Sequence, residues 1–321
     1  MSLTCVRALG SGPAEDRLLR LVPANAAIVA GIEDPHHGVQ SGGNQSGRLL
    51  FTTNNNNADL KDWIALVGVA DKQEVDGLVE VAMPSPRGDL ADHLLLARGS
   101  FEGARILNQA ETNGAAGREY RGVRIVELKP FQSKEKGMID TRWLTVIDDN
   151  TAVFGTPVMV MRALDRYLSS SATDGVLLKR MMTLRADVNC WSILAMPGAV
   201  LARHLPAGVV VSNDALLRGV SNVTVAVHYG SKDRVDFSIG TNNPEAATAF
   251  AAAMDGRSPL MPIADTLPAR LAAVSVEQNE VRGSVRVKDE EFSSWLTAVY
   301  ARLSTDRALS GENVARAGAA R

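Results

Sequence analysis

Pairs of strand-like runs followed by a helix-like run recur along this chain, and this recurrence most constrains how it can fold. The runs concentrate Val, Ile and Leu, and Gly, Pro, Asn or Asp separates them. The four pairs span residues 77–98, 142–154, 220–240 and 271–287. A strand pair buries one face under the helix that follows it, so neighbouring pairs predict antiparallel sheets covered by helices.

Cap residues mark where these helices are expected to begin. Thr156-Pro157 and Asn243-Pro244 each combine a capping side chain with proline at the first helical position. Ser100 and Asp289 are the predicted caps of the other two helices. The cap-then-proline device therefore occurs once in each part of the chain.

These patterns predict an α+β fold of two similar halves, each an antiparallel sheet built from repeated ββα units with helices on one face. The halves are expected to span residues 17–170 and 171–304, with residues 169–171 as the joint. Residues 1–16 and 305–321 are polar or rich in small residues, which predicts a disordered tail and a flexible C-terminal tail. Because the halves share little residue identity, internal duplication is a prediction from the pattern alone.

The balance of basic and acidic residues indicates which kinds of partner the sequence favours. The 34 basic and 36 acidic residues are dispersed, so the sequence lacks the basic footprint typical of nucleic-acid binding. No run of apolar residues is long enough to predict a transmembrane segment. The partners are not identified by the sequence, and exposed sheet or helix faces allow a homodimer.

The N-terminal residues are the part of the sequence from which the cellular compartment is predicted. Residues 8–16, which follow Arg7, are small and polar rather than a long apolar segment, so a signal peptide is not predicted here. A complete sequence of this kind predicts a cytoplasmic protein. If a native leader was removed ahead of Met1-Ser2-Leu3, a periplasmic or exported protein is expected instead.

A Gly-rich and Asn-rich loop is predicted over residues 34–58, ahead of a helix at 58–67. It contains His36-His37 beside Asp34, which raises the question of a metal site. Adjacent side chains rarely reach one ion, and no third ligand has suitable spacing, so a solvated turn is favoured.

The remaining histidines and an S-x-x-K match are the next candidates. His93, His204 and His228 are isolated, and ordinary exposed or hydrogen-bonded imidazoles are expected. Ser133 and Lys136 have serine–lysine spacing but lie in a charged loop without the partner motifs.

Paired carboxylates have a structural interpretation as well. Asp148-Asp149 lies between two strand-like runs, where a hairpin turn uses Asp for its geometry. Asp236 and Glu280 are expected on solvent faces of strands or in turns. The sequence contains no phosphate-binding loop, nucleophile elbow or C-x-x-C, so we assign no catalytic, cofactor-binding or metal-binding residue and no cofactor.

The two cysteines and the methionines favour structural roles. Cys5 and Cys190 do not make a disulfide framework, although a bridge between them is not excluded by sequence. The methionines at 159, 161, 181 and 182 are expected to fill the core between the halves rather than form an adaptable surface.

A run of motifs resembles an uncharacterised protein family of soil acidobacteria. The motifs include residues 21–32, 59–68 and 94–101, with Tyr120 to Val123 and Thr151 to Pro157 further along. The resemblance covers most of residues 18–205. It implies export, because members of that family usually carry an export signal, and it implies no activity or site residue.

The leading functional hypothesis is a non-catalytic binding or scaffold protein of the cell envelope. It rests on large predicted sheet surfaces and on the lack of a catalytic constellation. The alternative is a hydrolase-type enzyme with a site between the two halves. A His and a carboxylate converging on a nucleophile in a deep cleft would favour the enzyme.

Overall fold

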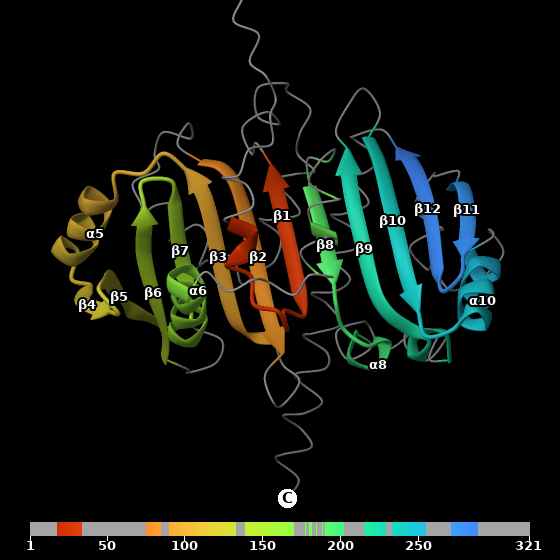
Figure 1. The fold of residues 1–321 in the computed structure, drawn as a ribbon, viewed down its shortest axis with the longest axis horizontal. Helices are drawn as coiled ribbons and strands as arrows, with labels where there is room; N and C mark the ends of the chain where they lie inside the picture. Colours follow the sequence, from red (N-terminus) through yellow and green to blue (C-terminus); the bar gives the residue numbers. More distant parts are fainter. Residues whose placement is uncertain are drawn as a thin grey trace, which may run out of the picture.

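The computed structural model describes residues 18–33, 75–84, 90–132, 139–169, 190–201, 215–228, 233–254 and 271–287, together with residues 177, 180, 181, 184 and 188. Their strands form one antiparallel sheet of twelve strands (Figure 1). The predicted loop at 34–58, the helix at 58–67, the helix after Asp289 and both tails lie outside the described residues.

The elements of the first part of the chain run from β1 to α6. They are β1 (Ile28–Glu33), β2 (Val75–Pro84), β3 (Leu90–Gly99), α5 (Gly103–Thr112), β4 (Ala116–Tyr120), β5 (Val123–Gln132), β6 (Ile139–Asp148), β7 (Thr151–Gly155) and α6 (Pro157–Ser169). Those of the second part are β8 (Cys190–Leu194), α8 (Gly198–Leu201), β9 (Val220–His228), β10 (Asp233–Thr241), α10 (Pro244–Met254), β11 (Leu271–Glu277) and β12 (Glu280–Val287).

The central ladder joins strands that are far apart in the sequence. β1 pairs with β8 in antiparallel register, with Ala30 opposite Ser192 at the middle of the ladder. From β1 the sheet continues outward through β2, β3 and β7 and then to β6, β5 and β4. From β8 it continues through β9, β10, β12 and β11. On both sides of the centre, the first three strands therefore lie in the order in which they occur in the chain, β1-β2-β3 on one side and β8-β9-β10 on the other.

Helices cover both faces of this sheet. The face turned to the viewer in Figure 1, which we call the front face, carries Val79 and Leu96, and α6 packs on it. The opposite face, which we call the back face, carries Leu95 and Ala152 under α5. α10 also packs on the back face, over Ile239 and its neighbours.

The predicted fold of two α+β halves, each with its own sheet and helices on one face, was wrong. The strands form one continuous, strand-dominated antiparallel sheet, because β1 and β8 pair with each other, so that neither strand has an exposed edge. β3 is apolar on both faces, with Leu94 and Leu96 opposite to Leu95 and Ala97, so both faces require cover. Internal duplication stays a prediction.

Most strand boundaries were predicted to within a few residues, but β4 was missed. Its residues, Ala116–Tyr120, are mainly exposed and include Arg118 and Glu119 between a glycine and a tyrosine. A short polar strand at the sheet edge has no apolar alternation to reveal it. β4 is connected to α6 by the hydroxyl of Tyr120, which donates to Asp165 Oδ1 at 3.0 Å.

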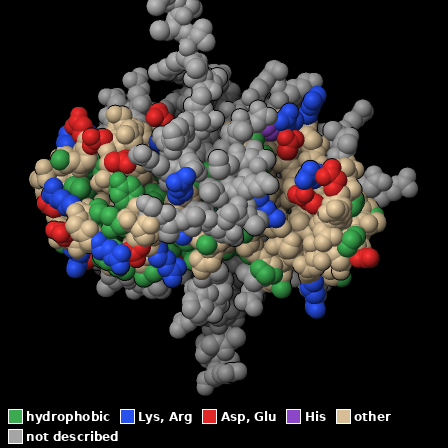
Figure 2. Space-filling view, in the orientation of Figure 1, with side chains coloured by type: hydrophobic (Ala, Val, Ile, Leu, Met, Phe, Trp, Pro, Cys, Tyr) green, Lys and Arg blue, Asp and Glu red, His purple; other side chains and the backbone are tan. Residues whose placement is uncertain are grey.

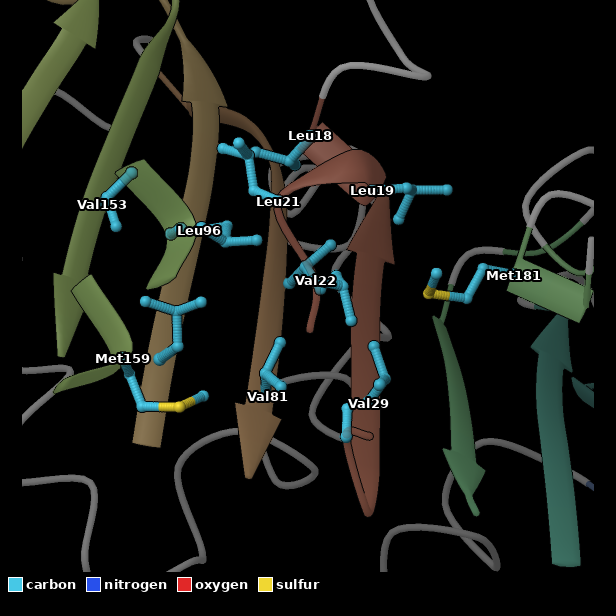
Figure 3. Packing of buried hydrophobic residues seen from close by; sticks show 14 of the residues in the cluster. Leu18, Leu19, Leu21, Val22, Val29, Val81, Leu96, Val153, Met159 and Met181 are labelled. Atoms are coloured by element: carbon cyan, nitrogen blue, oxygen red, sulfur yellow. The ribbon is translucent and has the colours of Figure 1, made fainter. Parts of the chain in front are cut away.

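The largest core cluster lies on the front face. Leu18, Leu21 and Val22, from the helical turn before β1, pack with Val81 and Leu96, and Met159 of α6 lies beside them (Figure 3). Of the four methionines expected to fill the core, Met159 and Met181 are fully buried in this cluster, Met161 is half-buried, and Met182 lies outside the described residues. The Trp191 ring occupies the space where Gly31 lacks a side chain.

None of the helices in the described part of the chain combines the length and apolar character required to cross a membrane. Domain boundaries at 170/171 and the tails stay predictions.

Candidate ligand recess on the front face

The strands β9, β10 and β12 are amphipathic. On β10, the back-face residues Val235, Phe237 and Ile239 alternate with front-face residues Arg234, Asp236 and Ser238. On β12, valines alternate in the same way with charged residues and Ser284. Alternation from Arg234 to Ser238 places the polar side chains of this stretch on one face, so the front face is polar here.

Pairing register arranges these polar side chains in rows that cross the strands. One row consists of Thr224, Ser238, Arg282 and Ser275, which are direct partners on β9, β10, β12 and β11. In the next row only the two central residues are polar, with Asp236 and Ser284 between Ala226 and Ala273. Adjacent strands lie about 4.8 Å apart, so each row of four spans about 14 Å.

A recess of about 540 Å³ opens over these two rows. Its lining comprises Leu184, Thr224, Ala226, Asp236, Phe237, Ser238, Ser275, Arg282, Gly283 and Ser284. Basic and acidic side chains are intermixed on the surface over β9 to β12 in Figure 2. The volume is in the range of small-molecule sites, which usually span about 300–1,000 Å³.

Glu280 and Arg282 form an ion pair at one border of the recess. Arg282 donates to Glu280 Oε2 from NH2 at 2.7 Å and from Nε at 3.1 Å, and Ser238 Oγ donates to Glu280 Oε1. Burial alone would raise the pKa of the Glu280 carboxyl. The bonds from Ser238 and Arg282 and the charge of Arg180 outweigh burial and lower the pKa below the usual 4.5.

Three polar side chains meet at the other border. Asp236 Oδ2 lies 2.9 Å from His228 Nε2 and accepts a hydrogen bond from Arg234 Nε at 3.0 Å. Arg234 NH2 lies 2.8 Å from the same imidazole nitrogen. His228 and Asp236 are therefore held by Arg234 and by each other. Asp236 Oδ1 accepts no hydrogen bond from any residue that the structure describes.

The same strand positions on the other side of the centre are apolar. Equivalent positions on the two sides are found by following the paired residues outward from Ala30 on one side and from Ser192 on the other. By this count, the positions of Thr224, Ser238 and Arg282 are equivalent to those of Val79, Leu96 and Val153, respectively. In the next row, Ala226, Asp236 and Ser284 correspond to Val81, Leu94 and Gly155. Val79, Leu96 and Val153 are fully buried in the front-face cluster, which includes α6 and the helical turn before β1, whereas their polar counterparts reach solvent.

Several sequence candidates are accounted for by this arrangement. His228 lies beside a carboxylate, but its ring contacts Arg234 and Asp236 rather than a nucleophile among the described side chains. Asp148 caps the β6–β7 turn as predicted, because its Oδ1 accepts a hydrogen bond from the Asn150 N–H at 2.9 Å. His93 lies on β3, away from the recess.

Other candidates lie outside the described residues. These are the Asp34, His36 and His37 group, the Ser133 to Lys136 segment, His204 and Cys5. Cys190 is buried on β8. Within the described ranges, no three His, Cys, Asp or Glu side chains gather as metal ligands.

Sequence reasoning missed the serines and the threonine of the recess. Asp236 and Glu280 were expected on solvent faces, and the alternation in β10 and β12 was available as a signal. What was missing was the register, which places residues from four strands in one row. A single strand cannot reveal which residues of another strand lie beside it.

No family model matches the sequence, and no curated protein or solved structure shows significant similarity to it.

Proposed function

We propose that this chain is a non-catalytic binding protein that holds its ligand in the recess on β9 to β12. One observation carries the proposal: corresponding front-face positions are apolar and buried on one side of the centre but polar and open on the other. Antiparallel sheets often leave one face polar and solvated, so polarity alone would not indicate a ligand, but here the polar positions also border a recess. Polar side chains in a concavity are typical of ligand recognition.

The hydrolase alternative needs a nucleophile next to a base. His228 contacts the carboxylate of Asp236, and no hydroxyl or thiol of the described residues contacts its ring. The ring nitrogens instead face the guanidinium of Arg234. This arrangement supports a positioning role for His228 rather than general base catalysis.

We further propose that the protein works in the cell envelope. The support is the resemblance of residues 21–32 and 94–101, among others, to a family whose members usually carry an export signal.

Native mass spectrometry tests the binding proposal. Protein purified without denaturation from its producing cells is expected to retain a small molecule, and Ser284→Phe is expected to lose it by filling the recess. Ser100→Phe is the matched control, because Ser100 is exposed and is not among the lining residues. A ligand that persists in Ser284→Phe, or a wild-type protein without any retained mass, would contradict the proposal.

A further inference from the structure

We infer that the recess binds a neutral, polyhydroxylated ligand of the saccharide class. This inference rests on the proposed binding function and names the chemistry of the ligand. It follows from which polar groups of the recess already have partners and which do not.

The charged groups already have partners of opposite charge. Asp236 contacts Arg234 through one carboxylate oxygen, at 3.0 Å. Arg282 contacts Glu280 at 2.7 Å and Glu277 at 3.0 Å. Acidic and basic side chains balance here, because Asp236, Glu277 and Glu280 face Arg234, Arg282 and the charge of Arg180, so an ionic ligand meets no net opposite charge. The recess therefore offers little to a phosphate, a carboxylate or an ammonium group.

The hydroxyl groups, in contrast, are available. Thr224, Ser275 and Ser284 line the recess, and none of their side chains bonds to another described residue. They come from three different strands, β9, β11 and β12. Each hydroxyl can donate one hydrogen bond and accept two, so the set suits a ligand with both kinds of group.

Two further groups complete a mixed set of donors and acceptors. Asp236 Oδ1 is an acceptor without a donor among the described residues, and the carboxylate is 37% exposed. Each terminal nitrogen of Arg282 carries a second N–H besides the one used in its ion pairs. A ligand hydroxyl can donate to the carboxylate and accept from the guanidinium without adding a charge. A polyol uses all these groups, whereas an ion uses only one kind.

The size of the recess is compatible with one or two sugar rings. Its two rows extend about 14 Å across the strands, and its volume is about 540 Å³. Since the front-face rows carry no aromatic side chain, recognition would rest on hydrogen bonds rather than on ring stacking.

Isothermal titration calorimetry of the full chain with a defined panel tests the inference. The neutral probes are glucose, galactose, maltose, cellobiose and N,N′-diacetylchitobiose, and the charged probes are inorganic phosphate, citrate and arginine. We expect at least one neutral saccharide to bind, and the charged probes not to bind. Thr224→Val and Ser284→Ala should each weaken that binding about three- to tenfold, which corresponds to one hydrogen bond.

Ser192→Ala is the matched control. Ser192 is half-buried on the central strand β8, but it lies on the back face and should leave saccharide binding unchanged. Equal weakening by Ser192→Ala would overturn the inference, because it would indicate a general loss of structure. The inference would also be overturned if neither Thr224→Val nor Ser284→Ala weakened saccharide binding.

The panel separates this inference from the proposed function. If phosphate, citrate or arginine binds, and Ser284→Phe abolishes that binding, the ligand class is wrong while the binding function stands. If no saccharide binds, the ligand class is overturned. If, in addition, native mass spectrometry detects no retained molecule, the proposed function fails with it.

Discussion

At the scale of single residues, the closest fit in the sheet centre lies between Gly31 and Trp191. These residues are direct partners on β1 and β8, and the Trp191 ring is 3% exposed. A Cβ atom at position 31 would overlap the ring at Cε2, Cζ2 and Nε1. The glycine is therefore required by a neighbouring side chain rather than by its own backbone conformation.

Gly31→Ala is expected to lower the free energy of unfolding by about 1–3 kcal/mol, the usual range for overpacking a core. Urea denaturation followed by tryptophan fluorescence measures this change. Gly240→Ala is the matched control, since the side chain it would meet, Asn222, is half-exposed and can rotate away. Equal losses in the two variants would contradict the assigned role of Trp191.

Glu280 gives the molecule a pH-dependent contribution to stability. Its pKa is lower in the folded protein than in the unfolded chain, so its contribution is present above pH 4.5 and is lost as the pH falls through the folded pKa. Glu280→Gln should therefore reduce the loss of unfolding free energy between about pH 6 and about pH 3.5. Chemical denaturation at the two pH values measures this difference in unfolding free energy. If the wild type and Glu280→Gln lost the same amount, the role of the ion pair would be refuted.

At the scale of elements, the helix N-termini show which caps could be predicted from local sequence and which could not. Asn243 was predicted to cap a helix, and its Oδ1 accepts a hydrogen bond from the Ala246 N–H at 2.8 Å. Thr156 precedes α6 as predicted, but its hydroxyl donates a hydrogen bond to Asp92 Oδ1 at 3.3 Å. The predicted cap at Ser100 was wrong, because α5 begins at Gly103 after Glu102 without a side-chain cap.

Asn243→Ala should destabilise the protein by about 1 kcal/mol, the usual cost of losing a helix N-cap. Ser100→Ala should leave stability within the error of the measurement, since Ser100 is exposed and α5 begins three residues later. Chemical denaturation of both variants provides the comparison. A larger loss in Ser100→Ala than in Asn243→Ala would reverse the assignment of the caps.

At the scale of the whole molecule, the two outer strands of the sheet differ. β4 is five residues long and carries Arg118, which forms an ion pair with Glu127, next to Glu119. β11 is seven residues long, has no charged residue before Glu277, and leaves Val276 41% exposed. Charges protect a sheet edge from pairing with another chain, so among the described residues β11 is the less protected edge.

Val276→Lys is expected to slow aggregation of the protein at elevated temperature, because it adds a charge to this edge. Light scattering at a fixed protein concentration follows the process. Glu119→Lys on β4 is the control and should not slow aggregation, since β4 already carries charged side chains. If only Glu119→Lys slowed aggregation, β4 would be the edge through which chains associate.

The sequence predicted most individual strands, and it failed on how they assemble. Alternation within β10 and β12 is a local property, so it could be seen in one segment. The pairing of β1 with β8 and the helices on opposite faces depend on contacts between distant segments. The recess was missed for the same reason, since its rows cross four strands.

The central ladder has a consequence for how the molecule acquires its structure. Ile28 pairs with Leu194, so this ladder closes a loop of more than 160 residues, whereas the β2–β3 and β9–β10 hairpins close within a few. The entropy of loop closure disfavours such distant pairings early in folding. The hairpins should therefore form first and the β1–β8 ladder last. Until it forms, β1 and β8 are open edges, and a newly made chain is most exposed there to pairing with the wrong partner.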